Sequence, residues 1–184
     1  MGDWSLHSRH THTRSVHQFF PAEPNARIGS LIIRSAMKAP KLTARQLRGS
    51  LARIPFNQLL GVKLTRLHPD GVTVECRVRD DLKNGAGVAH GGVAAALADV
   101  AVGMALNRHF GGKRRATTVE LKVSYFRPVT EGRIFARSHL LRIGSTLCVA
   151  SVDLTDAKAN SIGTAIVTYM LLDTARGIPD TGRI

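Results

Sequence analysis

The segment from Asn84 to Asp99 holds residues that could together act on a carbonyl compound. His90, Gly91 and Gly92 stand where an alanine-rich run begins. A helix start presents free N–H groups and a partial positive charge, and glycines let a ligand approach that backbone closely. Such a helix start could polarise a carbonyl oxygen and stabilise a developing oxyanion. A loop-to-helix junction that simply needs small residues is the alternative.

Asp99 and Asn84 supply side chains with the chemistry of a hydrolytic site. Asp99 lies within the apolar run Val93 to Leu106, which contains no basic residue to pair with it. A buried, unpaired carboxylate is costly, so we interpret Asp99 as a general base, although it could instead face solvent or hydrogen-bond to a loop. The amide of Asn84 could position water or a substrate carbonyl. An ordinary Asn-Gly turn would explain Asn84 equally well.

These residues need a helix that is enclosed by other elements. Residues Gly91 to Arg108 are rich in alanine and apolar nearly all round, which predicts a helix surrounded by protein. A shorter helix is predicted at Leu42 to Arg53, with Thr43 as its N-cap. Strand patterns cover Gly61–Leu67, Val72–Val78, Thr118–Phe126, Arg133–Arg142, Leu147–Thr155 and Ile162–Leu172. Because the links are short, we expect an antiparallel meander, and hence an α+β fold with the sheet wrapped around one central helix.

The spacing along the central helix predicts a site shared between subunits. Asp99 follows Gly91 by eight residues (99 − 91 = 8), which is roughly 12 Å along a helix axis. A carboxylate at that distance cannot reach a carbonyl held at its own helix start. We therefore expect a homodimer with two shared sites.

The same residues resemble the signature of the PaaI-type hotdog-fold thioesterases. The signature consists of Asn84-Gly-Ala-Gly-Val-Ala-His90-Gly-Gly followed by Ala96-Leu-Ala-Asp99. A later stretch, Thr117-Thr-Val-Glu-Leu-Lys-Val-Ser-Tyr-Phe-Arg-Pro128, is similar to the family's strand after the helix. The resemblance covers roughly Pro55 to Leu172. It implies the hotdog fold and hydrolysis of acyl-CoA thioesters to free acid and coenzyme A.

The resemblance also implies roles for individual residues and an assembly. Asp99 matches the catalytic carboxylate, which acts as general base or nucleophile, and Gly91 matches the backbone donor to the thioester oxygen. Asn84 and His90 match residues that position water and substrate, and Thr118 matches a position near the nucleophilic water. The implied site lies at the interface of a homodimer or homotetramer and uses neither a metal nor a dissociable cofactor.

Basic side chains are candidates for holding the phosphates of an acyl-CoA substrate, because arginine binds phosphate well. Together with the backbone of Gly92, the candidate substrate-binding residues are Arg108, Arg114, Arg115 and Arg127, with Lys113 beside them. A solvated loop would explain the cluster at residues 113–115 as well. The residue types do not distinguish among these positions.

Composition limits the other functional classes. The 184 residues carry a formal net charge of +13, which invites a nucleic-acid interpretation. The charge is spread along the chain, and no aromatic residues interleave with the basic cluster, so we do not favour that interpretation. There is no run of about 18 apolar residues, so we expect no membrane span. Cys76 and Cys148 have no metal-ligand spacing, and we expect buried thiols in a reducing compartment.

The two ends of the chain do not follow the pattern of the middle. Residues 1–40 contain His7, His10, His12 and His17 and show no sustained periodicity. We interpret them as a disordered or targeting-like extension; metal binding by the histidines and a true start at Met37 stay open. The thioesterase domain is expected at 41–175, with a flexible tail at 176–184. We expect a cytoplasmic protein, or mitochondrial import if the extension is a transit peptide.

Three other functions compete with hydrolysis. A hotdog hydratase or dehydratase would need a different pairing of histidine with an acidic residue. A non-catalytic acyl-CoA-binding module would not need Asp99. Nucleic-acid binding through the basic N-terminal segment would show a steep dependence on salt. The spacing of Asn84, His90 and Asp99 favours hydrolysis, while aromatic, medium-chain and long-chain acyl groups all stay open.

Overall fold

The computed structural model describes residues 40–172. The helices are α2 (Ala44–Ala52), α3 (Pro55–Leu60), the 3-10 turn η1 (Asp80–Leu82) and α4 (Gly91–His109). The strands are β1 (Lys63–His68), β2 (Gly71–Arg77), β3 (Arg115–Tyr125), β4 (Arg133–Ile143), β5 (Leu147–Asp156) and β6 (Ser161–Leu172). Most of the N-terminal extension, with its histidines and Met37, lies outside the described residues, as does the tail at 176–184.

Local sequence signals explain where the helices begin. The Thr43 side chain accepts a hydrogen bond from the Gln46 N–H, and the Gln46 side chain accepts one from the Thr43 N–H, which forms a capping box at α2. Pro55 occupies the first turn of α3, where a missing N–H costs nothing. The predicted long helix is confirmed as α4, whose extent agrees with the alanine-rich run.

The six strands form one antiparallel sheet in the order β1-β2-β4-β5-β6-β3. The predicted meander is therefore only partly right, because β4, β5 and β6 are consecutive neighbours but β3 pairs with β6 at the far edge. The physical reason is that α4 separates β2 from β3 in the chain. β3 therefore lies on the opposite side of the helix from β2, and the connection at residues 126–132 leads back to β4, which pairs with β2.

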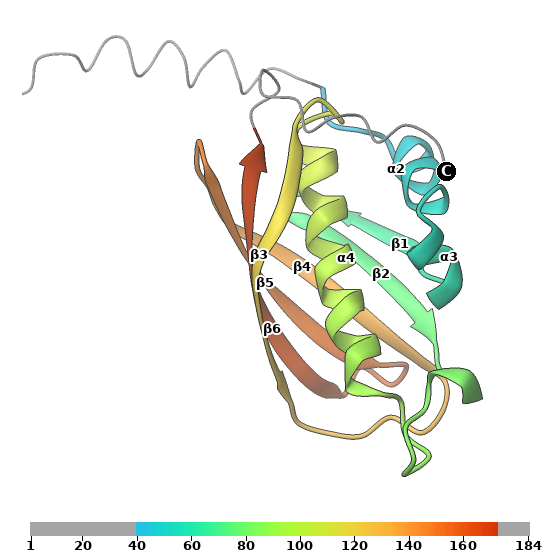
Figure 1. Cartoon of the computed structure of the whole chain (residues 1–184). Helices are drawn as coiled ribbons and strands as arrows, with labels where there is room; N and C mark the ends of the chain where they lie inside the picture. Colours follow the sequence, from blue (N-terminus) through green and yellow to red (C-terminus); the bar gives the residue numbers. More distant parts are fainter. Residues whose placement is uncertain (1–39, 173–184) are drawn as a thin grey trace, which may run out of the picture. The chain divides into compact units, whose positions relative to one another are not determined.

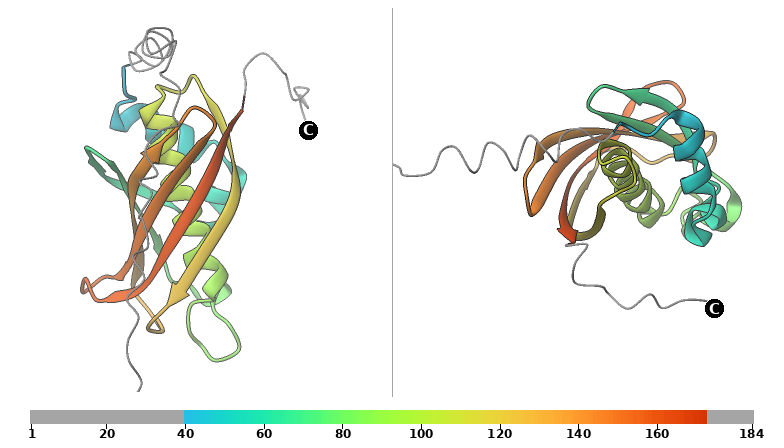
Figure 2. Two further views of the ribbon diagram at one scale, coloured as in Figure 1. Left: turned by 90° about the vertical axis from the view of Figure 1, so that its left-hand side faces the viewer. Right: turned by 90° about the horizontal axis from the view of Figure 1, so that it is seen from above.

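The sheet curves around α4, as expected for the hotdog fold (Figure 1; Figure 2, right). The helix buries alanine, valine, leucine and methionine side chains against the sheet, while α2 packs on another part of α4. The predicted inward face of β2 is confirmed, since Val72, Val74 and Cys76 are almost completely buried. Cys76 and Cys148 are buried free thiols, as predicted. Within residues 40–172, no helix is long and apolar enough to cross a membrane.

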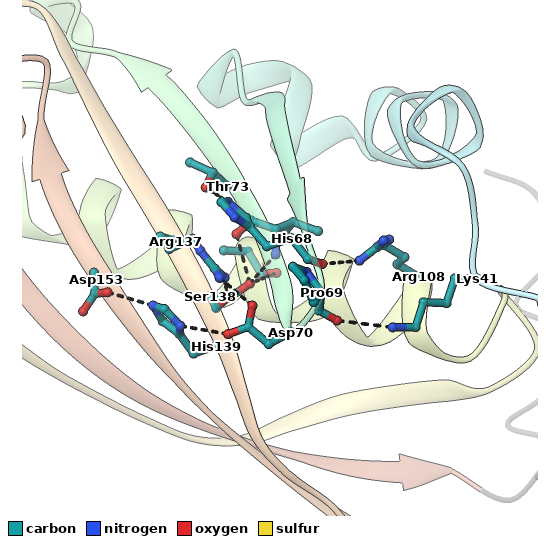
Figure 3. Close-up of polar contacts among 12 residues, drawn as sticks. Lys41, His68, Pro69, Asp70, Thr73, Arg108, Arg137, Ser138, His139 and Asp153 are labelled. Atoms are coloured by element: carbon teal, nitrogen blue, oxygen red, sulfur yellow. Dashed lines mark hydrogen bonds and ion pairs between the residues drawn. The ribbon is translucent and has the colours of Figure 1, made fainter. Parts of the chain in front are cut away.

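The β1–β2 turn is anchored by a polar network on the outer part of the sheet (Figure 3). Asp70 in this turn pairs with Arg137 and His139 of β4, and His139 also contacts Asp153 of β5 at 2.8 Å. The hydrogen bond from Arg137 lowers the pKa of Asp70 to about 2. Asp70 therefore has a structural role: its ionised carboxylate pairs with Arg137 and holds the β1–β2 turn against β4.

Candidate active site

The start of α4 presents the Gly91 N–H as a donor that no described residue uses. His90 is the N-cap, and its Nδ1 accepts a hydrogen bond of 3.0 Å from the Gly92 N–H. The Val93 N–H bonds to the His90 carbonyl oxygen at 2.9 Å. Among the described residues, the Gly91 N–H has no hydrogen-bond partner. Gly92, which the sequence suggested as a substrate contact, therefore uses its N–H for the cap, and Gly91 offers the open donor.

Tyr125 packs against this helix start, a contact that sequence reasoning missed. Its hydroxyl donates to the Gly91 carbonyl oxygen at 2.9 Å. A Cβ on Gly91 would lie 3.2 Å from the tyrosine ring, which is tighter than an ordinary contact. Glycine at this position thus serves the close packing of β3 on α4 as well as access to the backbone.

Asp99 lies in the middle of α4 and accepts two hydroxyl hydrogen bonds. Thr118 Oγ1 donates to Asp99 Oδ1 at 2.7 Å, and the Tyr169 hydroxyl donates to the same oxygen at 2.8 Å. Asp99 is half-buried. As expected, no cation pairs with Asp99 among the described residues. The carboxylate is less buried than expected, and its partners are hydroxyl groups on β3 and β6. Asp99 Oδ2 has no hydrogen-bond partner among the described residues.

A β-bulge at Val119 makes the contact between Thr118 and Asp99 possible. Thr118 pairs with Tyr169 and Glu120 pairs with Thr168, so Val119 is an extra residue in β3. In an unbroken strand, Thr118 would lie on the face of Glu120, away from α4. The bulge reverses the alternation, so that Thr118 and Tyr125 both reach the helix.

Tyr169 is the second residue that sequence reasoning missed. Its ring is buried in the inward face of β6, and its hydroxyl also lies 3.0 Å from the Asp99 carbonyl oxygen. Burial, followed by the charge of Asp99, raises the pKa of Tyr169 far above its usual range, so its phenol stays a proton donor. A signal was present, because a tyrosine within a buried, alternating strand needs a hydrogen-bond partner.

Asn84 is exposed in the loop before α4 and supports that loop. Its Oδ1 accepts from the Ala86 N–H at 2.9 Å and from the Val88 N–H at 3.4 Å. These bonds are those of an asparagine turn, the alternative considered from the sequence. They occupy the carbonyl of the side chain and leave its NH₂ group as the donor that a substrate or water could use.

The candidate arginines lie at two different places. Arg108 binds the His68 carbonyl oxygen (Figure 3). The Arg114 guanidinium lies 5.8 Å from the centre of the Phe110 ring. Both arginines are therefore committed to contacts near the C-terminal end of α4, where Arg115 also begins β3. Arg127 is exposed and follows β3 at the end where Tyr125 meets Gly91.

A cavity of about 370 Å³ lies beside the start of α4. Its apolar lining includes Phe56, Leu60, Leu82 and Val93, and His90 contributes to its polar rim. This combination of an apolar wall with a few polar groups is typical of a site for a small ligand. The cavity therefore adjoins the helix start where the Gly91 N–H is open.

Comparison with known proteins agrees with this geometry. The profile of the thioesterase superfamily matches residues 86–162. The medium/long-chain acyl-CoA thioesterase YigI of Escherichia coli (strain K12) is 32% identical over 133 residues, which are 64% of this chain and 86% of YigI. This chain belongs to the thioesterase superfamily. The enzyme is thus a thioester hydrolase, as the sequence signature predicted. Human acyl-coenzyme A thioesterase 13 is 34% identical over 103 residues, which are 55% of the thioesterase described here and 73% of the human protein.

Solved structures confirm the hotdog fold of the thioesterase. Thioesterase HI1161 from Haemophilus influenzae superposes with a TM-score of 0.70 at 19% identity, covering 77% of this chain and 99% of that one. A thioesterase family protein from Silicibacter pomeroyi superposes with a TM-score of 0.64 at 29% identity, covering 70% and 97% of the two chains.

Proposed function

We propose that this enzyme hydrolyses acyl-CoA thioesters to the free acid and coenzyme A. The observation that carries the proposal is the state of Asp99: two hydroxyls hold one carboxylate oxygen, and the other oxygen has no partner among the described residues. The names of the relatives, YigI and acyl-coenzyme A thioesterase 13, support acyl-CoA as the substrate class.

In the proposed reaction, the Gly91 N–H donates to the thioester carbonyl oxygen. Asp99 acts as general base, taking a proton from the water whose oxygen attacks the carbonyl carbon, or acts as the nucleophile itself. The negative charge that develops on the carbonyl oxygen is stabilised by the Gly91 N–H and by the positive end of α4. Collapse of the intermediate breaks the C–S bond, and coenzyme A leaves as the thiolate. If water attacked, the free acid forms in this step; if Asp99 attacked, a mixed anhydride forms, and water then hydrolyses it to release the acid and regenerate the carboxylate.

Asn84 and His90 are proposed to position water and substrate. Because His90 Nδ1 accepts a hydrogen bond from Gly92, the neutral ring carries its proton on Nε2. That N–H is a donor beside the helix start. The NH₂ group of Asn84 is a second donor in the preceding loop. Both proposals therefore rest on groups that the local hydrogen bonds leave available.

The distance along α4 supports a site built from two subunits. Asp99 and Gly91 lie on one uninterrupted helix, about 12 Å apart along its axis. One thioester cannot contact both groups of the same subunit. We therefore propose that Asp99 of one subunit acts on a thioester held by Gly91 of another, and a tetramer would contain two such dimers.

The edge strand β3 is the proposed dimer interface. One edge of β3 has no neighbouring strand among the described residues. Val119 is 51% exposed and Tyr125 is 54% exposed, so this edge carries apolar side chains that a second copy could cover. A two-fold axis halfway between Asp99 and Gly91 would lie about 6 Å from each along the α4 axis. Thr118 contacts Asp99, and about 6 Å corresponds to about two residues of a strand, so the axis would pass about two residues along β3 from Thr118. That position is Glu120, the midpoint of the strand.

The cavity beside α4 is the proposed place for the acyl chain, because Phe56, Leu60 and Val93 give it an apolar wall. Arg127, which is exposed near the same helix end, is the proposed contact for the coenzyme A phosphates. Arg108 and Arg114 are less suitable, because the contacts described above already hold them.

The test is release of free thiol from a panel of acyl-CoAs by the purified full chain. Wild type should release thiol, and Asp99→Asn should lose at least about a hundredfold in kcat while keeping its fold and acyl-CoA binding. Asp156→Asn, at the last residue of β5, is the matched control: among the described residues, the Asp156 carboxylate bonds only to Lys158 and Asn160 of the following turn, so the variant should retain wild-type turnover. Binding without thiol release by wild type would favour an acyl-CoA-binding module. Near-normal turnover by Asp99→Asn would exclude Asp99 as base or nucleophile.

A mixing experiment tests the shared site. Asp99→Asn and Gly91→Pro are each expected to be inactive alone. If they are unfolded and refolded together, random pairing gives heterodimers in about half the population, each with one intact site and one doubly altered site, so about a quarter of wild-type activity should return. No recovery despite demonstrated subunit exchange would show that each site is confined to one subunit.

A further inference from the structure

Two hydroxyls converge on the same oxygen of Asp99. Thr118 Oγ1 and the Tyr169 hydroxyl lie 2.7 and 2.8 Å from Asp99 Oδ1. They come from β3 and β6, which are paired at this point, so the sheet fixes both donors relative to α4. A carboxylate that accepts two hydrogen bonds on one oxygen loses its freedom to rotate, and its other oxygen is presented in a defined direction.

The Tyr169 hydroxyl is also tied to the backbone of the residue that it contacts. It lies 3.0 Å from the carbonyl oxygen of Asp99 while it donates to the carboxylate. One hydroxyl that bridges the main chain and side chain of a single residue restricts the side-chain torsions between them. Tyr169 is itself almost completely buried in a sheet, so it is a rigid support.

Gly103 makes room for this hydroxyl. It lies one helical turn after Asp99 on α4, and a Cβ built there would lie 3.0 Å from the Tyr169 hydroxyl oxygen but 3.7 Å from the ring carbon that bears it. Only the hydroxyl group therefore requires glycine at this position. The absence of a side chain at Gly103 thus leaves space for the hydroxyl that donates to Asp99.

We infer that Tyr169 is a positioning residue for the reaction: with Thr118 it holds Asp99 Oδ1, so that Oδ2 is the oxygen that receives the proton of water or attacks the thioester. This inference rests on the proposed function. Tyr169 does not contact substrate and acts only through Asp99. Its role is to keep the reactive carboxylate in one orientation before the thioester arrives.

The first test is Tyr169→Phe, which keeps the ring and removes only the hydroxyl. We expect kcat for thiol release to fall by roughly 10- to 100-fold with KM little changed, because a hydrogen bond to a charged group is lost while the substrate contacts remain. Ser138→Ala is the matched control. Ser138 is also a buried hydroxyl that donates to an α4 carbonyl, that of Ala101, but it does not contact Asp99. It should lower the melting temperature and leave kcat unchanged.

The second test uses Gly103→Ala, which displaces the hydroxyl from the other side. In the wild-type background it should lower kcat, whereas in the Tyr169→Phe background it should add little, because the nearest remaining contact is an ordinary 3.7 Å. Equal losses from Gly103→Ala in both backgrounds would overturn the inference. So would Tyr169→Phe with wild-type kcat. Absence of thiol release by wild type would instead refute the proposed function, so the two failures can be told apart.

Discussion

Replacing Gly91 by proline removes a single N–H group from the candidate site. Gly91 is the first residue of α4, where the N–H has no partner within the helix and proline is well tolerated. The preceding residue, His90, has φ −61° and ψ 135°, an extended conformation that is compatible with a following proline. The helix should therefore still begin at this residue. Both proline and alanine bring a Cβ to 3.2 Å from Tyr125, so Gly91→Ala reproduces the steric change and keeps the N–H.

The difference between the two variants measures the contribution of the N–H. Loss of one preorganised donor to an oxyanion typically lowers kcat by about 10²- to 10³-fold, or about 2.7–4 kcal/mol. Gly91→Ala should lose far less, because the tyrosine ring needs to move by only a few tenths of an ångström. We therefore expect Gly91→Pro to be at least about a hundredfold slower than Gly91→Ala.

The assay is steady-state thiol release with one good acyl-CoA substrate, together with circular dichroism and thermal unfolding of all three proteins. The comparison is valid if the two variants unfold at similar temperatures. If folded Gly91→Pro and Gly91→Ala had similar kcat values, the Gly91 N–H would not be the donor to the thioester, and the role of the α4 start in the mechanism would have to be abandoned.

Three further outcomes follow from the same contacts. Leu121→Lys, on the exposed edge strand β3, should convert the proposed dimer to a monomer and lower activity in parallel. Light scattering coupled to chromatography measures the molar mass, and an active monomer would contradict the proposed shared site. Asp70→Asn should lower the free energy of unfolding at pH 7, as measured by denaturant titration. The pKa of Asp70 is lowered from 3.8 to about 2 in the folded state, so its ionised carboxylate stabilises the protein only above these pH values. The difference in stability between wild type and Asp70→Asn should therefore disappear as the pH falls from about 4 to about 2. Arg127→Ala should raise KM for acyl-CoA with little change in stability, because Arg127 is exposed. Arg108→Ala should chiefly lower stability, because Arg108 binds the His68 carbonyl oxygen. A raised KM in Arg108→Ala and an unchanged KM in Arg127→Ala would assign the phosphates to Arg108.

The sequence predicts the parts of the fold that depend on neighbouring residues. The bounds of α4 follow from its alanine-rich run, and the N-cap of α2 follows from Thr43 and its capping partner. The alternation in β2 predicts its buried face. Each of these features is decided within one element, by propensity, capping and periodicity.

Sheet order and the bulge in β3 depend on contacts between distant segments and were not predictable in the same way. The alternation of β3 places Thr118 on the face of Glu120, but pairing with β6 inserts Val119 and reverses that face. The two donors to Asp99 lie 19 and 70 residues away from it along the chain. Asp99 could therefore be chosen from the sequence, whereas the groups that hold it depend on strand register.

Asp70 and Asp99 have different kinds of partner, and the difference separates a structural carboxylate from the proposed reactive one. Asp70 is neutralised by Arg137, so its negative charge stabilises the β1–β2 turn and is unavailable for reaction. Among residues 40–172, Asp99 forms no ion pair, and its partners are neutral hydroxyls. Hydroxyl donors orient a carboxylate without a cation beside it. Hydroxyl partners in place of an arginine therefore agree with the proposed role of Asp99 as base or nucleophile, since an ion pair would hold the carboxylate more strongly.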